Sequence, residues 1–364
     1  MNEKEAAILE MLRRNPFLTQ QEMAESLGIS RPALANLISG LMRRGVIRGR
    51  AYILAEENRV VAIGGANLDR KFHLKAPAQS GTSNPASVTA SVGGVARNVA
   101  ENIGRMGHPV SLLTVAGNDS DWFQIEQESA GHIDLSHAAL LPEKTTGSYS
   151  AVLDPDGEMV VAMADMEVYE DLTPQYIDTH APLLMNAALA VVDLNCPKET
   201  VVHIKELIQR SGKELAIVPV SSPKMDRMPD DLEGVTWLIC NRDEAETYTG
   251  IQVEDDASWR KAVRLLLDKG AENVVVTSGS RGVMAGNADG IRHYAAIGGV
   301  HVEDVTGAGD AFVSGVLHGH LSGFGFDDKI RCGLVNAAKT LASGATVRPE
   351  LSAEQLKTEM EELR

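Results

Sequence analysis

From Arg59 onward, short runs of apolar and β-branched residues alternate with longer stretches in which apolar residues recur at helical spacing. This alternation is typical of β-α units, in which helices cover both faces of a mostly parallel sheet. We therefore expect an α/β/α sandwich over residues 59–364. Its strands are expected within residues 60–65, 111–117, 187–195, 213–220, 235–241 and 273–279.

Two segments do not fit this alternation. Within about 69–92 and 145–165, apolar and polar residues alternate around turn signals, and the sequence DPDG at residues 154–157 is typical of a hairpin turn. We expect these segments to form a small β lid outside the main sheet. The acidic residues of the turn are expected to be ordinary surface charges.

The first 55 residues have a different pattern. Apolar residues at three- and four-residue spacing predict a helix near the start, and Thr19 with Glu22 forms a capping-box pattern before a stretch that ends at Gly28. Ser30 is then placed to cap a third helix, which has Pro32 in its first turn. The sequence therefore predicts three short helices.

Helix, short turn and helix is the spacing of a helix-turn-helix, whose second helix lies in the DNA major groove. Residues 1–55 resemble a winged helix-turn-helix domain, with residues 46–54 as the wing. A three-helix module used only for dimerisation or docking fits the same pattern, so DNA is one of two alternatives. The polar residues expected to face the groove and the arginines expected to meet phosphates are Ser30, Arg31, Asn36 and Ser39, and Arg43, Arg44, Arg48 and Arg50.

Charge is distributed unevenly between these two parts. Residues 1–55 carry eight Lys or Arg against five Glu, a net charge of +3, whereas the whole chain of 364 residues carries −16 and its remainder −19. This balance argues against nucleic-acid binding by the whole surface. No apolar stretch reaches the length of a membrane span, the start lacks signal-peptide features, and the three cysteines have no metal-ligand spacing. We expect a cytoplasmic protein with reduced thiols and no membrane partner.

The segment DVTGAGDAF, residues 304–312, leads into an apolar helix. A glycine-rich turn at a helix start points several backbone N–H groups at one spot, which together with the helix dipole favours an anion such as phosphate. Asp310, in the first helical turn, is placed to take a proton from a hydroxyl that attacks beside that anion. The plainer alternative is a glycine turn in which Asp310 is only a helix N-terminal charge.

Four further segments carry polar residues after expected strands. Residues 93–107, GGVARNVAENIGRMG, place paired glycines before a helix that contains an asparagine, which offers both donors and acceptors to hydroxyl groups. The segment GANLD, residues 65–69, lacks the GxGxxG spacing of a dinucleotide site. NRDEAE at 241–246 and TSGSRG at 277–282 are, taken alone, a common helix start and a common turn.

In this order the segments resemble the signatures of the ribokinase-like (PfkB-type) kinase family, over residues 59 to about 350. The resemblance implies a ribokinase-like α/β/α sandwich with a β lid, and an ATP-dependent kinase in which Asp310 is the catalytic base. It also implies that the amides of Gly307, Ala308 and Gly309 form the anion hole. The residues that it assigns to the acceptor are Asn67, Asp69, Gly93, Gly94 and Asn98.

The same resemblance assigns a nucleotide side. The residues implied for ATP are Asn241, Glu244, Thr277, Gly279, Gly282 and, in the adenine pocket, Asn336. Glu244 is also the residue expected to help hold Mg²⁺, which is commonly shared with substrate phosphates. Asp304 and Thr306 fall where many family members bind a monovalent cation such as K⁺.

Local features point to the acceptor. Residues 83–85, the stretch 145–166 and the stretch 241–251 resemble pseudouridine kinases more than ribokinases or fructokinases, which implies phosphorylation of a nucleoside, at O5′, with Asp165 near its base or sugar. Val218 departs from the pattern, because an aspartate is expected before Pro219. A plain sugar is the alternative acceptor. A sugar phosphate is disfavoured, since residues 145–167 of the lid offer no basic residue for its phosphate group.

A different class of function also fits the sequence, namely a DNA-binding regulator that uses the kinase fold only to sense a nucleoside or sugar. A pure sensor needs no base at position 310, so the intact DVTGAGDAF segment favours catalysis. The resemblance further implies a homodimer, because family members often pair through their lids and winged helix modules favour two-fold pairing.

Overall fold

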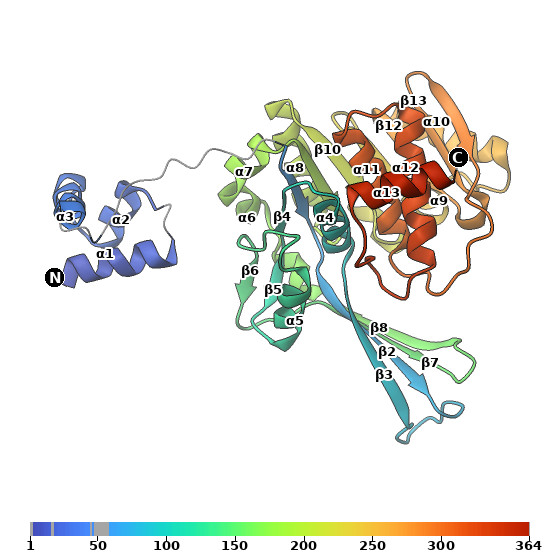
Figure 1. The fold of residues 1–364 in the computed structure, drawn as a ribbon, viewed down its shortest axis with the longest axis horizontal. Helices are drawn as coiled ribbons and strands as arrows, with labels where there is room; N and C mark the ends of the chain where they lie inside the picture. Colours follow the sequence, from blue (N-terminus) through green and yellow to red (C-terminus); the bar gives the residue numbers. More distant parts are fainter. Residues whose placement is uncertain (1–2, 16–17, 44–45, 47–57, 364) are drawn as a thin grey trace. The chain divides into compact units, whose positions relative to one another are not determined.

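The computed structural model describes residues 3–15, 18–43, 46 and 58–363. The chain divides into two compact units, Met1–Ala55 and Glu56–Arg364, and each is described here by itself (Figure 1). Among the described residues, no helix is both long and apolar enough to span a membrane.

The first unit contains three helices, α1 (Glu3–Arg14), α2 (Gln20–Ser26) and α3 (Arg31–Arg43). The predicted capping box is confirmed: the Thr19 hydroxyl accepts from the Glu22 N–H at 3.2 Å, and the Glu22 carboxylate accepts from the Thr19 N–H at 2.7 Å. Gly28 follows α2 with a positive φ of 60°, which a side chain would disfavour. The three helices bury one small core, made of Ile8, Met23, Ala24, Leu34, Ile38 and Leu41.

The exposed face of α3 carries the polar residues that the sequence placed toward DNA. Ser30, Arg31, Asn36, Ser39 and Arg43 are all exposed, whereas the core residues of the helix are buried. Arg44, Arg48, Arg50 and the predicted wing beyond residue 46 lie outside the described residues.

The second unit is built on an eight-stranded sheet in the order β14-β13-β12-β11-β10-β9-β1-β4. The pairs from β4 to β12 are parallel, and β12–β13 and β13–β14 are antiparallel. All six predicted runs contribute to this sheet, but the β13–β14 hairpin was not predicted, because its strands contain glycine and charged residues. The strands are β1 (Val60–Ile63), β4 (Val110–Leu113), β9 (Leu189–Asp193), β10 (Glu214–Val218), β11 (Trp237–Asn241), β12 (Asn273–Thr277), β13 (Val283–Asn287) and β14 (Gly290–Tyr294).

Helices cover both faces of this sheet (Figure 1). Successive residues of β1 alternate between two cores, with Val60 and Ala62 in one and Val61 and Ile63 in the other. On the first face lie α4 (Val95–Arg105), α5 (Ser120–Ser129), α11 (Ala308–Leu321), α12 (Phe326–Leu341) and α13 (Ala353–Glu362). On the second lie η1 (Glu167–Asp171), α6 (Pro174–Thr179), α7 (Ala181–Asn186), α8 (Lys198–Ser211), η2 (Ser222–Arg227), α9 (Arg242–Thr249) and α10 (Asp256–Asp268).

A separate four-stranded sheet in the order β3-β2-β7-β8 extends away from the body of the unit (Figure 1). Its predicted hairpin is confirmed, since β7 and β8 pair antiparallel around the DPDG turn. The strands of this lid are β2 (Asn67–Leu74), β3 (Ala86–Gly93), β7 (Ser148–Leu153) and β8 (Met159–Asp165). A small two-stranded sheet joins β5 (Val115–Gly117) and β6 (Ala139–Leu141).

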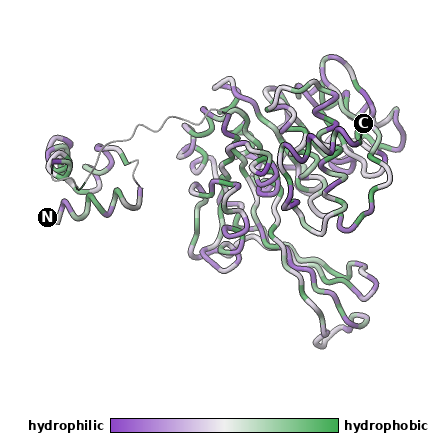
Figure 2. Tube along the Cα trace, viewed as in Figure 1, coloured by the Kyte–Doolittle hydropathy of each residue, from purple (hydrophilic) through white to green (hydrophobic). Residues whose placement is uncertain are grey.

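The two faces of the lid differ. One face carries Asp69 and Lys71 toward the start of α11, because the Lys71 ammonium contacts Asp304. The register of the four strands aligns Val88, Phe72, Val152 and Val161 in one row on the opposite face. Val88 is 54% exposed and Val161 is 48% exposed, so this row leaves apolar surface open to solvent. Figure 2 shows that hydrophobic and hydrophilic residues both occur along the lid.

Candidate active site

The start of α11 forms the glycine turn that the sequence analysis assigned to an anion. Gly307 precedes the helix with a φ of +80°, and a Cβ there would lie 2.2 Å from the Thr346 carbonyl oxygen, so glycine is required. A Cβ at Gly309 would meet no atom within 4 Å, which leaves open space beside the first amides of the helix. Ala308, Gly309 and Asp310 are the first three helical residues, whose N–H groups have no partner within the helix. This end of α11 can therefore receive an anion.

Asp310 lies beside this turn, and a neighbouring helix holds its carboxylate. The Asn98 side-chain amide, on α4, donates to Asp310 Oδ2 at 2.8 Å. Desolvation raises the pKa of Asp310 to about 7; the Asn98 hydrogen bond opposes this shift, while the charges of Asp193, Asp69 and Glu244 add to it. A carboxylate with a pKa near neutrality suits a general base.

The orientation of Asn98 is itself determined by its neighbours. Arg97 Nη1 donates to Asn98 Oδ1 at 3.2 Å, so the Nδ2 group is the end that faces Asp310. Arg97 is buried, donates through Nε to Ser129 Oγ at 3.1 Å and forms an ion pair with Glu101. The predicted acceptor residue Asn98 is thus joined directly to the predicted base.

The remaining predicted acceptor residues come together where β2 and β3 meet. Asn67 Nδ2 donates to Asp69 Oδ1 at 2.5 Å, and a Cβ on Gly93 would lie only 2.4 Å from Asp69 Oδ2. Gly94 has a φ of +97°, and its Cβ would lie 2.4 Å from the Gly65 carbonyl oxygen. Burial raises the pKa of Asp69 to about 6, opposed by the Lys71 charge and the Asn67 amide.

Two buried side chains that the sequence analysis missed hold this acceptor side in place. Asp193, at the end of β9, accepts from the N–H groups of Gly65 at 3.0 Å and Ala96 at 2.9 Å, so one carboxylate fixes two separate turns. The Tyr169 hydroxyl donates to the Ala66 carbonyl at 2.6 Å. An aspartate that ends an apolar parallel strand was the available signal for Asp193; Tyr169 gave none.

The nucleotide side lies at the ends of two neighbouring strands. Asn241 and Thr277 are register partners on β11 and β12, so the N-x-x-E and T-x-G-x-x-G segments begin side by side. Gly279 has a φ of +51° and open space around its Cβ position. A Cβ on Gly282, where φ is +84°, would lie 2.1 Å from the Tyr294 carbonyl. The loop therefore needs both glycines, and only Gly279 borders open space.

Glu244 is the residue that fits Mg²⁺. It forms a capping box with Asn241: Glu244 Oε2 accepts from the Asn241 N–H at 2.8 Å, and Asn241 Oδ1 accepts from the Glu244 N–H at 2.9 Å. Burial raises the pKa of Glu244, and the negative charge of Glu244 adds to the rise in the pKa of Asp310. Among the described residues, no group of three or more His, Cys, Asp or Glu is arranged to hold a metal. Such a donor set fits a Mg²⁺ ion that phosphates help to hold.

Comparison with known proteins agrees with this geometry. The family model described as pfkB family carbohydrate kinase matches residues 57–352. The uncharacterized sugar kinase YeiI from Escherichia coli K12 is 32% identical over 356 residues, which cover 97% of this chain and 98% of that protein. The chain belongs to the pfkB family of carbohydrate kinases.

A second relative and a solved structure are also similar to this pfkB kinase. The pseudouridine kinase from Escherichia coli K12 is 29% identical over 300 residues, which cover 82% of this chain and 95% of that protein. The structure of Arabidopsis thaliana ribokinase complexed with ribose and ATP has a TM-score of 0.75 at 17% identity, covers 84% of this chain and 99% of its own, and shows the ribokinase-like fold. A second family model, described as winged helix-turn-helix DNA-binding, matches residues 1–48. The first unit is therefore a winged helix-turn-helix module.

Within the pfkB unit, a lysine side chain contacts Asp304 and Thr306, the two residues that the sequence analysis assigned to a monovalent cation. The ammonium of Lys71 lies 2.8 Å from Asp304 Oδ2 and 3.2 Å from the Thr306 hydroxyl. The other carboxylate oxygen, Asp304 Oδ1, accepts from the Thr306 N–H at 2.9 Å and from its hydroxyl at 2.7 Å. The sequence analysis did not single out this lysine. Its ammonium group thus contacts both side chains that were assigned to a monovalent cation.

The structure does not bring Asn336 to the other nucleotide residues. Its side chain is fully buried, its Nδ2 donates to the Ala311 carbonyl at 2.8 Å, and its Oδ1 accepts from Arg348 at 3.0 Å. These bonds connect α12 to α11 and to the C-terminal segment. The structure therefore gives Asn336 a packing role rather than a place on an open adenine pocket.

Asp165 also lies apart from the acceptor residues. Strand register sets Asp165 beside Ser148 and Ser148 beside Leu68, so Asp165 is on the lid face opposite Asp69. Its carboxylate accepts from the Thr145 hydroxyl at 3.2 Å. Tyr149, the register partner of Asp69, is the β7 residue on the active-site face, and the sequence analysis missed it.

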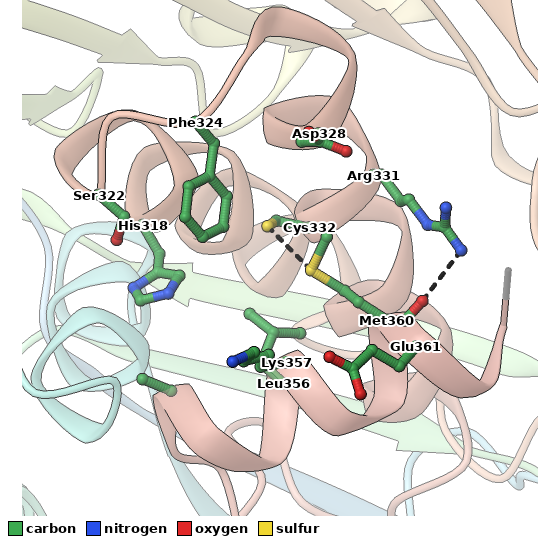
Figure 3. A pocket seen from close by; sticks show the side chains of 11 residues that line it. His318, Ser322, Phe324, Asp328, Arg331, Cys332, Leu356, Lys357, Met360 and Glu361 are labelled. Carbon is green, nitrogen blue, oxygen red and sulfur yellow. Dashed lines mark hydrogen bonds between the residues drawn. The ribbon is translucent and has the colours of Figure 1, made fainter.

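A cavity of about 410 Å³ lies at the far end of α11 from Asp310 (Figure 3). It is enclosed by α11, α12 and α13, and His318, Phe324 and Met360 are among the residues that line it. None of the predicted site residues borders it. The candidate active site is therefore identified from the carboxylates and glycine turns, and this cavity is not part of it.

Proposed function

We propose that this pfkB kinase transfers the γ-phosphoryl group of ATP to a hydroxyl of a nucleoside, with pseudouridine as the acceptor and O5′ as the attacking atom. The observation that carries the proposal is the contact of Asp310 with Asn98 at the open N-terminus of α11. A carboxylate of near-neutral pKa in this position would lie between the phosphate and the acceptor hydroxyl. The pseudouridine kinase and the ATP-bound ribokinase among the similar proteins support the choice of acceptor class and donor.

In the proposed reaction, Asp310 accepts the proton of the attacking hydroxyl while the new bond from that oxygen to the γ-phosphorus forms. The bond from the γ-phosphorus to the β,γ-bridging oxygen breaks, and ADP leaves with that electron pair. The first amides of α11, at Ala308 and Gly309, hold the transferring phosphoryl group. The Asn98 amide keeps the Asp310 carboxylate facing the acceptor.

The acceptor would be held by Asp69 and Asn67, with Gly93 and Gly94 allowing its hydroxyls close to the backbone. Tyr149 lies beside Asp69 and is the residue that we assign to the face of the nucleobase. Glu244 would hold Mg²⁺ together with the phosphates, and the ion would reduce the negative charge that develops there. Closure of the lid would keep water from taking the phosphoryl group.

The test is ADP release with Mg·ATP against pseudouridine, uridine, inosine, ribose and fructose, with Asp310→Asn as the blank for contaminating kinases. We expect pseudouridine to give the highest kcat/KM among the five. A preference for ribose or fructose would replace the nucleoside by a plain sugar and leave the phosphoryl transfer intact. Absence of turnover with every acceptor would overturn the kinase proposal.

A second function is favoured by the winged helix-turn-helix module. We propose that α3 binds DNA through its exposed face, which presents Arg31, Asn36 and Arg43 away from the core of the module. Mobility shift of the protein's own promoter DNA, with and without the nucleoside, tests this proposal. Equal mobility of promoter and unrelated DNA at physiological salt would leave the module as a docking element.

We also propose that two copies pair through the exposed lid face. The apolar row of Val88, Phe72, Val152 and Val161 crosses all four strands, and a two-fold axis would bring this row against the same row of a second copy. Sedimentation should give a dimer for the full chain and a monomer for Val161→Lys. A dimer that survives this substitution would place the interface elsewhere.

A further inference from the structure

The Lys71 side chain reaches across the cleft from the lid to the segment before the anion-binding turn. Lys71 and Asp69 lie two residues apart on β2 and therefore point to the same face. The Lys71 ammonium forms an ion pair with Asp304 at 2.8 Å and also contacts the Thr306 hydroxyl at 3.2 Å. One cation thus lies next to an acceptor residue and next to the turn that receives phosphate.

The contacts of Asp304 pair each of its two carboxylate oxygens with a donor. Lys71 takes Oδ2, and the N–H and hydroxyl of Thr306 take Oδ1. The carboxylate is therefore already paired, and Lys71 rather than a K⁺ ion balances its charge.

The position of this pair explains why a cation is needed there. Asp304 lies three residues before Gly307, so its negative charge would oppose a phosphate at the start of α11. A neighbouring positive charge removes that repulsion and holds the turn in shape. Lys71 also borders a cavity of about 380 Å³ together with Asp304, Thr306 and Thr346, so the pair faces open space beside the turn.

We propose that the Lys71 ammonium replaces a monovalent cation, so that nucleotide binding and turnover in this kinase do not depend on K⁺. Lys71 is then a positioning residue: it neutralises Asp304 and joins the acceptor strand β2 to the nucleotide turn. The turnover part of this inference rests on the proposed phosphoryl transfer, whereas the nucleotide-binding part stands without an acceptor.

The test compares the full-length wild type with Lys71→Met and Lys71→Arg in KCl, NaCl and tetramethylammonium chloride at equal ionic strength. ADP affinity is measured by calorimetry, turnover by ADP release and folding by thermal unfolding. We expect wild-type ADP affinity and turnover to be equal in the three salts. Lys71→Met should bind ADP about tenfold more weakly in tetramethylammonium chloride, and K⁺ should restore most of that loss. Lys71→Arg, which keeps the charge, should remain independent of K⁺.

Lys75→Met is the matched control, because Lys75 is an exposed lysine next to the end of the same strand. It should behave as the wild type in every salt. Wild-type ADP affinity that rises severalfold with K⁺ would overturn the proposal. So would Lys71→Met binding that equals the wild type, or that is weakened and not restored by K⁺. ADP binding needs no acceptor. Loss of turnover with every acceptor would therefore contradict the proposed function, while the effect of K⁺ on ADP affinity could still be interpreted.

Discussion

The acceptor side and the nucleotide side of the cleft are held together in different ways. On the acceptor side, Asp193 binds the Gly65 and Ala96 amides, Asn98 binds Asp310, and Lys71 binds Asp304, all across long stretches of chain. On the nucleotide side, the contact of Asn241 with Glu244 joins residues three apart, and the Ser278 N–H donates to the Gly282 carbonyl at 2.9 Å. The acceptor side depends on the whole fold, whereas the nucleotide side is built from local turns at strand ends.

This difference predicts how each side responds to substitution. A change in a long-range contact should move two segments at once and lower both stability and acceptor chemistry. A change in a local cap should leave the remaining fold nearly unaltered. Asp310 belongs to both sides, because its helix is the proposed phosphate site and Asn98 connects it to the proposed acceptor side. Its loss should therefore have the largest effect.

Asp310→Asn should lower kcat by about a thousandfold, since general-base catalysis contributes on this order. The substitution keeps an oxygen to accept from Asn98, so acceptor binding measured by calorimetry should change little. Because folding raises the pKa of Asp310 to about 7, the protein loses stability as pH rises from the unfolded value toward 7. Removing the charge should therefore raise the free energy of unfolding at pH 8, by about 2 kcal/mol.

The pH profile of the wild type is the second readout of Asp310. The base must be ionised, so kcat/KM should fall about tenfold per pH unit below the pKa of about 7. Asp289→Asn, at an exposed turn, is the control and should keep wild-type turnover and stability. A flat profile between pH 5 and pH 8, or a kcat of Asp310→Asn within tenfold of the wild type, would remove Asp310 from the role of base.

The same difference between the two sides explains which features of the fold and the site could be predicted from the sequence. Capping patterns and glycine turns are local, so the helix-turn-helix, the DPDG hairpin, the glycine turn before α11 and the Asn241–Glu244 cap were all readable. The six main strands were readable because buried parallel strands are continuous apolar runs. These features were enough to predict the fold class and to propose where the site lies.

Contacts between residues that are far apart in the sequence could not be predicted from it. Tyr169 and Lys71 have ordinary sequence surroundings, and their roles appear only when the fold brings them to Ala66 and Asp304. Asp165 was expected at the acceptor, but the face on which it lies depends on strand register across three strands, which the alternation alone does not give. Asn336 was expected at the nucleotide, yet it is buried between helices.

Asp193→Asn should have the next largest effect and tests the long-range side. One carboxylate oxygen accepts from the Gly65 and Ala96 N–H groups and the other accepts from the Asn195 N–H, so an amide NH₂ group on either side would face an N–H donor. The free energy of unfolding should fall by about 1–3 kcal/mol, and acceptor kcat/KM by about a hundredfold, because both acceptor turns shift. Urea unfolding and separate KM values check this result. An equal rise of the KM for ATP would mean that the two sides are not held independently.

Glu244→Gln should have the smallest effect and tests the local side. The glutamine keeps an oxygen to accept from the Asn241 N–H, so the helix cap persists and stability should change by less than about 0.5 kcal/mol. The lost charge should weaken Mg²⁺ retention and raise the KM for Mg·ATP about tenfold, with the KM for the acceptor unchanged. Asn241→Ala is the opposite control, because it removes the cap and keeps the carboxylate, so stability should fall by about 1 kcal/mol. If Glu244→Gln instead raised the acceptor KM as much as that of ATP, the nucleotide side would depend on long-range contacts just as the acceptor side does.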